Sequence, residues 1–419
     1  TIILPCFRLE VKQKMNWRKS VEKTKKTGFG KNVGFYIFLG LLSAIYAVVL
    51  ELSKNTIVGW GLFFALLIAL IWLRIALKKK EKWNAFLLVG CLGAYIVLLL
   101  LVLRVTAPPV RAIAAAPERN PEATDVVRVK EGELTGVYTK DKGVRVYAGI
   151  PYAAAPVGER RFQEPQPAEP WDGVRACDTF GPMAMQQRSS VFYNSLTQIL
   201  GTHNYEVSLY DHFVPPMSED CLYLNIWAPA DAGDEPLPVL FFIHGGSLMT
   251  GESYYSEYRG EDLARQGIIV VNFAYRLGVF GYYANEDLEE ESEHGTTGDY
   301  GLLDQIAALQ WVHDNIAAFG GDPDRITIVG ESAGSMSVSA LVASPLTKGL
   351  FARAMASSGS VLSGTIPTQE EADAIGVAKL SEMGVNSIAE ARAMPADEPI
   401  AIKRSSSFSV KCPPFLFKT

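Results

Sequence analysis

The sequence has few cysteines and histidines, and their number and spacing exclude several classes of protein. Its 419 residues include five cysteines and five histidines. No two cysteines have the C-x-x-C spacing, which argues against a zinc site or a disulfide-rich scaffold. The net charge is −6, so the composition gives no support for nucleic-acid binding. No segment repeats with a period of about twenty to fifty residues, which argues against a solenoid or a propeller.

Three long apolar runs occupy most of the first hundred residues, at 33–50, 57–77 and 85–103. Each is close to the roughly 20 residues that a helix needs to cross a bilayer core. Buried helices of a soluble domain are the alternative, but charge that lies only between the runs favours membrane spans. The sequence therefore predicts a three-span membrane anchor over residues 33–104.

The charges that flank these runs predict the orientation of the anchor. Lys and Arg crowd the segment before the first run, from Lys12 to Lys31, and four lysines lie in the second loop, at 78–82. The first loop, 51–56, has one lysine and one glutamate. Basic loops stay in the cytoplasm, so we expect residues 1–32 to be cytoplasmic and everything after residue 104 to lie outside. The prediction is a multi-pass protein of the cell membrane.

The composition changes twice after the third run. Residues 105–125 are rich in Ala and Pro, which is typical of an extended linker. From Val126 onward, short apolar strands alternate with helical patterns. The runs 239–243, 268–273 and 326–329 read as strands, and apolar residues at 302, 306, 309, 312 and 316 form a helical stripe that ends at Gly320-Gly321. This order predicts an α/β domain over 126–402, with a mostly parallel sheet and helices on both faces.

One pentapeptide in this domain carries a specific chemical signal. Gly330-Glu331-Ser332-Ala333-Gly334 matches the G-x-S-x-G nucleophile elbow and follows the predicted strand 326–329 directly. Small residues around the serine permit the sharp strand-to-helix turn that exposes its hydroxyl. The histidines all precede the serine, at His203, His212, His244, His294 and His313. In the α/β-hydrolase order the histidine follows the serine, so the general base is not at its usual place.

A second glycine-rich element precedes the elbow. His244-Gly245-Gly246-Ser247 comes directly after the strand 239–243, where such a fold places its oxyanion loop. Glycines allow the backbone to turn its N–H groups toward a developing negative charge. The alternative is an ordinary turn at the end of a strand, which the elbow downstream makes the weaker interpretation.

These elements belong to a longer series of matches, from about Val126 to Ser360. On them the chain resembles the type-B carboxylesterases, the cholinesterase-like branch of the α/β hydrolases, and more the bacterial members than the animal cholinesterases. Besides the elbow, the matching strings are Tyr147-Ala148-Gly149-Ile150-Pro151-Tyr152-Ala153, Ser218-Glu219-Asp220-Cys221-Leu222-Tyr223-Leu224-Asn225, Tyr275-Arg276-Leu277-Gly278, Gly301-Leu302-Leu303-Asp304-Gln305, Gln310-Trp311-Val312-His313-Asp314-Asn315-Ile316 and Phe319-Gly320-Gly321-Asp322-Pro323.

The resemblance implies a role for each matching position. Ser332 would be the nucleophile that forms an acyl-enzyme with a small ester, and the backbone N–H groups of Gly246, Ser247 and Ala333 would form the oxyanion hole. Glu331 would be a buried carboxylate of the pocket, and Ser358 its secondary serine. The resemblance implies no metal or organic cofactor.

The chain also departs from the family pattern. Ser247 stands where the family has a third glycine or an alanine, and Ser335 where a glycine is usual. The family's disulfide partner for Cys221 is absent near residue 184, so Cys221 either pairs with Cys177 or is free. The triad acid and histidine would lie beyond residue 419, and residues 403–419 match nothing in the family. We therefore expect a C-terminally incomplete esterase domain and little hydrolysis by the fragment itself.

Other interpretations remain open at this point. The segment from Asn285 to His294 holds six carboxylates, which suits a solvated acidic loop better than a cation site, because the ligand pattern of a calcium loop is absent. His313 lies on the predicted helix 302–316 and is interpreted as a structural residue rather than a base. The alternative to an enzyme is a non-catalytic, cholinesterase-like adhesion or binding ectodomain.

Overall fold

The computed structural model describes residues 33–401, except 52, 54, 81–83, 108–111, 117, 188–214, 232, 234, 296 and 362–367. The chain divides into two units, a helical unit whose described residues end at 107 and an α/β unit that contains the described residues from 112 onward. The basic N-terminal segment and the tail 403–419 lie outside the described residues.

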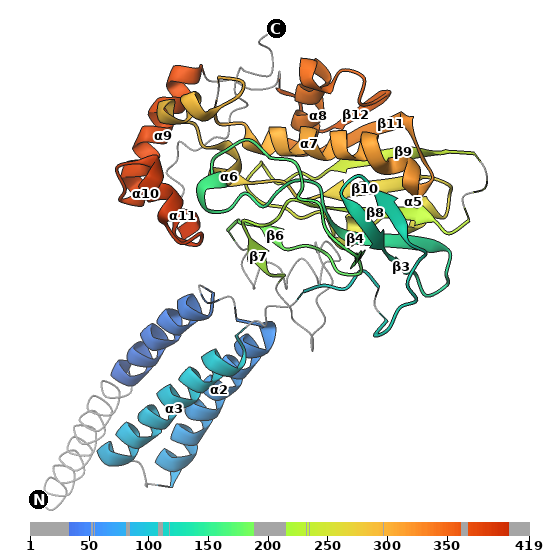
Figure 1. Ribbon diagram of the computed structural model, residues 1–419. Helices are drawn as coiled ribbons and strands as arrows, with labels where there is room; N and C mark the ends of the chain where they lie inside the picture. The colour runs from blue at the N-terminus through green and yellow to red at the C-terminus, as the bar shows by residue number, and fades with distance from the viewer. Residues whose placement is uncertain are drawn as a thin grey trace, which may run out of the picture. The chain divides into compact units, whose positions relative to one another are not determined.

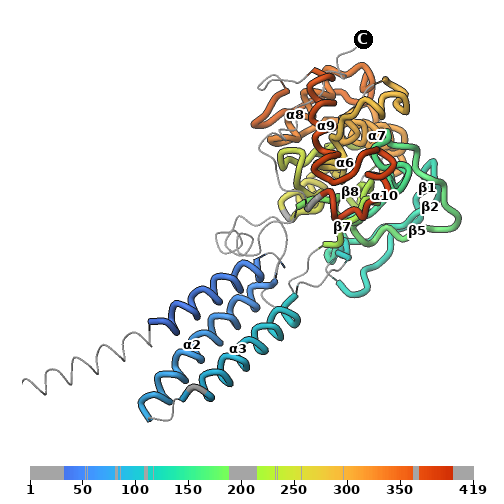
Figure 2. Tube along the Cα trace, turned by 90° about the vertical axis from the view of Figure 1, so that its left-hand side faces the viewer, coloured from blue at the N-terminus to red at the C-terminus, as the bar shows by residue number. Residues whose placement is uncertain are grey.

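The helical unit consists of three long apolar helices that lie side by side (Figures 1 and 2). They are Val33–Glu51, α2 (Ile57–Lys79) and α3 (Ala85–Val105). All three apolar runs are therefore helices, as predicted, and each is long and apolar enough to cross a membrane. Asn84 caps α3, because its side chain accepts a hydrogen bond from the N–H of Leu87.

Polar contacts tie the three helices together where they pack. The hydroxyl of Tyr46 donates to the carbonyl of Leu99 at 2.6 Å. The side chain of Asn55, which is fully buried, donates to the carbonyl of Leu103 at 2.7 Å and to the hydroxyl of Thr106 at 2.9 Å. Hydrogen bonds of this kind stabilise helix packing in an apolar environment, where unpaired polar groups are costly.

The α/β unit contains a main sheet of seven strands (Figure 1). The strands are β3 (Val137–Tyr138), β4 (Val144–Pro151), β8 (Tyr223–Pro229), β9 (Leu237–Ile243), β10 (Ile269–Phe273), β11 (Gly321–Glu331) and β12 (Arg353–Ser357). Their order across the sheet is β12-β11-β9-β10-β8-β4-β3. Strand β11, which leads to the elbow, lies between β9 and β12 and is parallel to both.

The prediction of a mostly parallel sheet is wrong for half of the sheet. The strands from β12 to β10 are parallel, whereas β10-β8, β8-β4 and β4-β3 are antiparallel pairs. The physical reason lies in the connections. The parallel strands are joined by segments that contain helices, whereas β3 and β4 follow each other through a short turn, which permits only an antiparallel pair.

Shorter elements surround this sheet. One small sheet contains β1 (Val127–Val129), β2 (Gly132–Thr135) and β5 (Val174–Ala176). Another contains β6 (Met183–Ala184) and β7 (Met217–Ser218). The helices are α5 (Glu261–Ala264), α6 (Gly278–Tyr282), α7 (Tyr300–Asn315), α8 (Ala333–Ala343), α9 (Gln369–Met383), α10 (Ile388–Ala393) and α11 (Glu398–Ala401). Short 3₁₀ helices occur at η1 (Gly158–Arg160), η2 (Ser256–Tyr258), η3 (Glu286–Glu291), η4 (Ile316–Phe319) and η5 (Pro345–Thr347).

The two faces of the sheet are covered unequally. Alternate residues of β9, namely Val239, Phe241 and Ile243, are fully buried in the main core with apolar residues of α7 and α8. Leu240 and Phe242 point to the other face and are only half-buried. There a second core gathers Trp227, Val270 and residues of loops and of the short α5. Helices therefore lie on both faces, as predicted, and the long helices α7 and α8 lie on the face of the main core.

The segment predicted as an extended linker, 105–125, belongs partly to the α/β unit. Ala115 and Ala116 are buried in the second core, and the N–H of Ala115 donates to the carbonyl of Asp178 at 2.8 Å. Thr124 bonds to Gly136 in both directions. An Ala- and Pro-rich composition is compatible both with a packed segment of this kind and with an extended linker, so the composition alone did not distinguish the two.

A buried ion pair fixes the end of β10 to helix α7. The guanidinium of Arg276 donates to both carboxylate oxygens of Asp304, at 2.8 and 2.7 Å, and its backbone N–H donates to the same carboxylate at 3.0 Å. The side chains are 3% and 0% exposed. Because both charges are removed from water, the pair depends on this complete hydrogen bonding.

Candidate active site

Ser332 lies in a sharp turn between β11 and α8. Its backbone has a φ of 56° and a ψ of −120°, a conformation that costs a residue with a side chain about 1–3 kcal/mol. The N–H of Ser332 donates to the carbonyl of Ser357 at 2.9 Å, and its own carbonyl accepts from Met336 at 3.1 Å. The elbow predicted from the pentapeptide is therefore present, and the surrounding hydrogen bonds hold the strained residue in place.

The glycines of the pentapeptide are required by close backbone contacts. A Cβ on Gly330 would overlap the carbonyl oxygen of Gly334, and a Cβ on Gly334 would overlap the carbonyl oxygen of Ile243. The first contact tightens the turn itself, and the second brings α8 against the end of β9. The neighbouring strand β9 is the one that leads into the glycine-rich loop.

The glycine-rich segment from His244 to Gly251, which we call the oxyanion loop, lies against the elbow. A Cβ on Gly245 would lie 3.2 Å from the Cβ of Ser332 and 2.8 Å from the carbonyl oxygen of Glu331. The loop turns back on itself, since the amides of Met249 and Thr250 both donate to the carbonyl of Gly246, at 3.1 and 3.0 Å. The fold thus brings together two motifs that are about eighty residues apart in the sequence.

The amides predicted to form the oxyanion hole are available in the described part of the chain. Those of Gly246, Ser247 and Ala333 donate no hydrogen bond to any described residue. Gly246 has a φ of 110°, and a Cβ there would overlap the carbonyl oxygen of Thr250. Ser247 has a φ of 58° and an exposed side chain, so a serine occupies a backbone conformation that favours glycine.

The predicted pocket residues Glu331 and Ser358 lie close to the elbow but are not buried. Both side chains are exposed, which corrects the expectation of a buried carboxylate at Glu331. Glu331 is the last residue of β11 and lies beside Gly245. Ser358 follows β12 with a φ of 63°.

None of the described histidines forms a hydrogen bond with Ser332. The ring of His244 is buried, and burial lowers its pKa to about 4, so it is neutral at physiological pH. His294 pairs with Glu164 at 2.8 Å, and His313 lies 3.5 Å from the carboxylate of Asp314. His203 and His212 lie outside the described residues. The predicted structural role of His313 is consistent with its place on α7.

The sequence did not indicate two residues whose side chains form hydrogen bonds with the backbone of the oxyanion loop. The hydroxyl of Tyr275 donates to the carbonyl of His244 at 2.8 Å. The side-chain amide of Gln186 bonds both the N–H and the carbonyl of Gly251, at 2.9 and 2.7 Å. Tyr275 stands in one of the matched strings, but nothing in the sequence indicated its target, because the two contacts span 31 and 65 residues.

Both cysteines considered for a disulfide are free and buried. Burial raises the pKa of the Cys177 thiol to about 12 and that of Cys221 well above its usual value. Both therefore remain protonated, as expected of inert core thiols. Of the two alternatives, the free Cys221 is confirmed.

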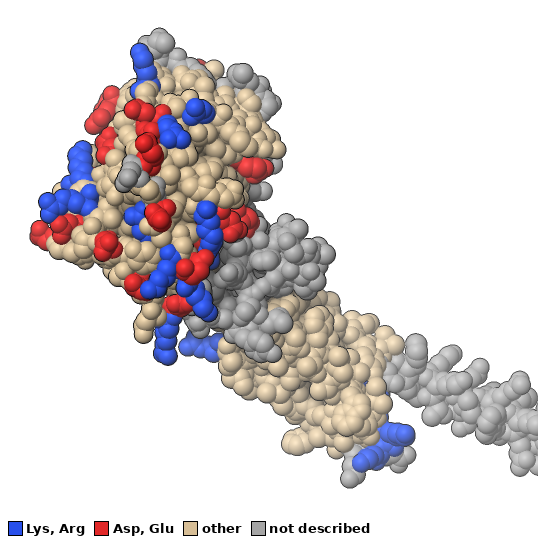
Figure 3. All heavy atoms as spheres, turned by 90° about the vertical axis from the view of Figure 1, so that its right-hand side faces the viewer, with Lys and Arg blue, Asp and Glu red and all other residues tan. Residues whose placement is uncertain are grey.

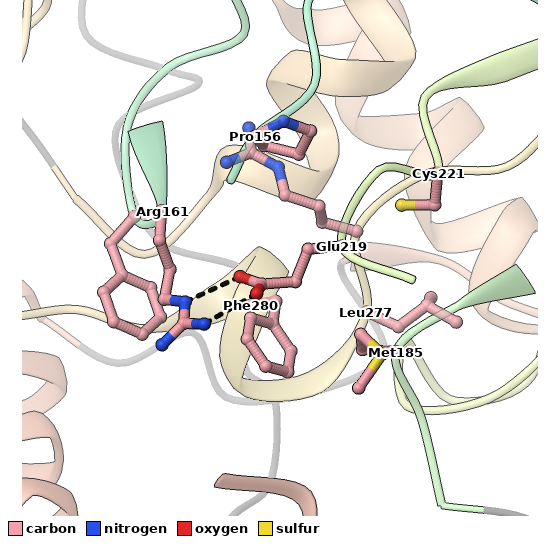
Figure 4. A pocket seen from close by; sticks show the side chains of 9 residues that line it. Pro156, Arg161, Met185, Glu219, Cys221, Leu277 and Phe280 are labelled. Carbon is pink, nitrogen blue, oxygen red and sulfur yellow. Dashed lines mark hydrogen bonds and ion pairs between the residues drawn. The ribbon is translucent and has the colours of Figure 1, made fainter. Parts of the chain in front are cut away.

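A small pocket, partly open to solvent, lies beside Cys221 (Figure 4). One wall is the ion pair in which Arg161 donates two hydrogen bonds to Glu219, both at 2.6 Å. Arg161 also donates to the carbonyls of Ala391 and Met394 and so attaches the α10 region to the domain. None of the predicted site residues lines this pocket, so it is separate from the elbow. No cluster of three or more potential metal ligands occurs among the described residues, the acidic segment 285–294 included.

Comparison with known proteins gives one consistent result. Residues 123–395 match the family model described as "Carboxylesterase family". Carboxylesterase 1C of Rattus norvegicus is 45% identical over 249 residues, which are 58% of this chain and 42% of the relative. Cocaine esterase of Oryctolagus cuniculus is 43% identical over 277 residues, 65% of this chain and 47% of the relative.

A solved structure, carboxylesterase EST55 of Geobacillus stearothermophilus, superposes with a TM-score of 0.55 and 41% identity. The superposition covers 66% of this chain and 52% of that chain. The chain thus spans less than half the length of these curated relatives. Because animal and bacterial relatives are similarly close, the bacterial character of the chain stays a prediction.

Proposed function

The chain belongs to the carboxylesterase family, and from this premise we propose that it serves as a serine carboxylic-ester hydrolase of the type-B, cholinesterase-like branch. The observation that carries the proposal is the contact between the strained elbow at Ser332 and the oxyanion loop. The hydroxyl of Ser332 attacks the ester carbonyl, the alcohol leaves, and water then releases the acid from the acyl-enzyme.

The charge that develops in this reaction falls on the carbonyl oxygen of the ester. The amides of Gly246, Ser247 and Ala333 are the proposed donors to that oxygen, and each such donor can contribute about 3 kcal/mol to the transition state. Because these are backbone groups, the serine at 247 preserves the donor. The mechanism needs no metal or organic cofactor. It does need a base for the Ser332 proton. His244 and His294 are engaged elsewhere, and His313 lies on α7 beside Asp314.

Covalent labelling of the detergent-solubilised chain tests the nucleophile. A fluorophosphonate should modify the peptide that contains Ser332, and S332A should remove the label. Added imidazole, as an external base, should accelerate the modification if no histidine of the chain reaches the serine. S335A is the matched control, since Ser335 is buried and its hydroxyl donates to the carbonyl of Gly359. Absence of label with and without imidazole, or label that persists in S332A, would contradict the proposal.

We also propose that the three helices of the helical unit cross the cell membrane, with the N-terminus in the cytoplasm and the esterase domain outside. In support, the exposed large apolar residues of the chain are concentrated on these helices, among them Ile37, Ile68, Trp72 and Val97. Figure 3 shows one face of the helices with hardly any charge along their length and with charged side chains abundant on the α/β unit. Lys78 and Lys79 end α2, on the predicted cytoplasmic side.

Fractionation and protease access test this topology. The chain should stay with the membrane after alkaline extraction, and protease added to intact spheroplasts should digest the esterase domain. The deletion of residues 33–105 should release the α/β unit into the soluble fraction. Extraction of the complete chain by alkaline buffer would contradict the anchor, and a protected esterase domain would reverse its orientation.

A further inference from the structure

Glu252 lies directly after the oxyanion loop and is almost completely buried, with 1% of its surface exposed. One carboxylate oxygen, Oε1, accepts hydrogen bonds from the N–H and the hydroxyl of Ser253, at 2.6 and 2.7 Å. The other oxygen, Oε2, has no hydrogen-bond partner. A buried carboxyl group with an unpartnered oxygen is costly, and far more so when it carries a charge. It therefore requires an explanation.

The position of Glu252 is coupled to that of the loop. Gly251 packs so closely on the ring of His244 that a Cβ at 251 would overlap its Nδ1. On the other side, the hydroxyl of Ser253 accepts a hydrogen bond from Asn225 of β8 at 3.2 Å, and Asn225 also bonds Asn272 of β10 at 3.0 Å. Glu252 thus lies between the loop and a buried amide network of the sheet. In this arrangement its carboxyl group is shielded from solvent.

No positive charge offsets the carboxylate within the described residues. Burial raises the pKa of Glu252 to about 8, although hydrogen bonds from Ser253 and the backbone of Tyr254 act in the opposite direction. The neighbouring titratable groups are neutral, since His244, whose ring contacts Gly251, has a pKa lowered to about 4 and the pKa of the buried Cys221 is raised. Arg276, the nearby cation, is already paired with Asp304. Glu252 therefore holds a proton at neutral pH.

We propose that Glu252 is a positioning residue whose neutral carboxylic acid keeps the oxyanion loop closed, and that loss of its proton to solvent opens the loop. The effect of loop opening on catalysis rests on the proposed function, because an open loop would no longer present the Gly246 amide to an ester. The opening itself does not depend on that function. It follows because an ionised carboxylate is stabilised by water, and the closed loop shields Glu252 from water.

The proposal predicts a definite pH dependence of loop opening. The closed loop binds one proton that the open loop releases above the ordinary pKa of a glutamate. Between that pKa and about 8, the opening constant should therefore rise by up to about tenfold per pH unit. E252Q keeps the shape of the side chain and removes the ionisation, so its opening constant should not rise in this way.

Hydrogen–deuterium exchange of the complete chain in detergent tests this prediction. Exchange of peptides that cover residues 244–251 is measured from pH 6 to pH 8 and corrected for the intrinsic exchange rate. Protection in the unaltered chain should fall by about tenfold per pH unit relative to E252Q. E257Q, at an exposed glutamate five residues further on, is the matched control and should behave like the unaltered chain. Identical pH dependence with and without Glu252 would overturn the proposal.

A second variant keeps the test decisive if E252Q does not fold. S253A removes a hydroxyl that stabilises the carboxylate in the closed loop, so the rise of the opening constant with pH should continue to a higher pH before it levels off. For this variant the exchange series is extended above pH 8, and levelling off at the same pH as in the unaltered chain would also overturn the proposal. Exchange requires no turnover. A failure of Ser332 to react therefore counts against the proposed esterase function, and an insensitive loop counts against the role of Glu252.

Discussion

The ring of His244 stacks on the ring of Tyr275, with 4.4 Å between the ring centroids and 22° between the ring planes. The same tyrosine donates its hydroxyl to the backbone carbonyl of His244 at 2.8 Å. Tyr275, which follows β10, thus contacts both the ring and the backbone of His244 at the start of the oxyanion loop. This arrangement, together with the lowered pKa of the ring, gives His244 a supporting role rather than that of a base.

Removal of the Tyr275 hydroxyl should weaken this support. Y275F loses one buried hydrogen bond and leaves the His244 carbonyl without this donor, so we expect a loss of about 1 kcal/mol in the free energy of unfolding. The stacking of the rings should persist. Y138F is the matched control, because the hydroxyl of Tyr138 bonds no described residue. Urea denaturation of both variants checks the difference, and equal stability would show that the hydrogen bond contributes nothing.

The strain at Ser332 should be measurable as stability. Its φ of 56° suits glycine, and its hydroxyl caps no amide of α8, so S332G should stabilise the fold by about 1 kcal/mol. S332A keeps the Cβ and hence the strain, and should be nearly neutral. Denaturation of the pair separates backbone strain from loss of the hydroxyl. If S332A is as stable as S332G, the elbow stores no strain.

The close approach of α8 to β9 should make Gly334 intolerant of a side chain. G334A places a methyl group on the carbonyl oxygen of Ile243, and relief requires movement of helix or strand. We expect a destabilisation of about 2–4 kcal/mol. G143A, in an exposed turn where the added methyl group meets only ordinary contacts, should change stability by less than about 0.5 kcal/mol. Thermal unfolding of the two variants decides the matter, and similar values would contradict the close contact.

Neutralising one carboxylate should reduce the free energy of unfolding much more in the buried Arg276–Asp304 pair than in the exposed Arg128–Glu133 pair. D304N leaves the guanidinium of Arg276 buried without a counter-charge and should cost about 3–5 kcal/mol. E133Q breaks the pair with Arg128, whose side chain is 81% exposed, and should cost less than about 1 kcal/mol. Free energies of unfolding at low and high salt provide the measurement. A small effect of D304N would mean that water reaches Arg276.

Because of Asp299, the free energy of unfolding of the α/β unit should fall as the pH rises. Burial, with a smaller contribution from Glu164, raises its pKa to about 8, and neither carboxylate oxygen has a partner. Between its ordinary pKa and about 8 the folded chain keeps a proton that the unfolded chain releases. Stability should therefore fall as pH rises, by up to about 1.4 kcal/mol per unit.

D299N removes this ionisation and should become more stable relative to the unaltered chain as the pH rises from 5 to 8. D262N, at a side chain that is 98% exposed, is the control and should leave the slope unchanged. Midpoints of thermal unfolding over this pH range check the prediction. Parallel curves for D299N and the unaltered chain would show that Asp299 is ionised in the folded state.

The elements that the sequence predicted correctly share a strong local signal. Residues 239–243, 268–273 and 326–329 are short, mostly apolar runs, and they correspond to β9, β10 and part of β11. The helical stripe from Leu302 to Ile316 corresponds to α7 and η4, and Gly320 ends it with a φ of 92°. The elbow and the glycine-rich loop were equally visible, because tight turns beside buried strands restrict the residue types that fit.

Features that depend on distant contacts were not predictable. The antiparallel half of the sheet, the packed alanines at 115 and 116, and the exposure of Glu331 each depend on what lies opposite them in space. The supports of the oxyanion loop belong to the same class, since Gln186, Glu252 and Tyr275 have no distinctive local pattern. The contacts of Gln186 and Tyr275 with the loop join elements far apart in the chain.

The sequence by itself determined the three apolar helices, the strands that lead to the site, and the identity of Ser332 as the candidate nucleophile. These follow from local rules of hydrophobic period, glycine geometry and turn chemistry. The tertiary structure decided that Gly245 meets Ser332, that His244 is buried and neutral, and that Glu252 is enclosed beneath the loop. Burial and electrostatic environment arise only when the chain is folded, because they depend on the neighbours that surround a group and not on its place in the sequence.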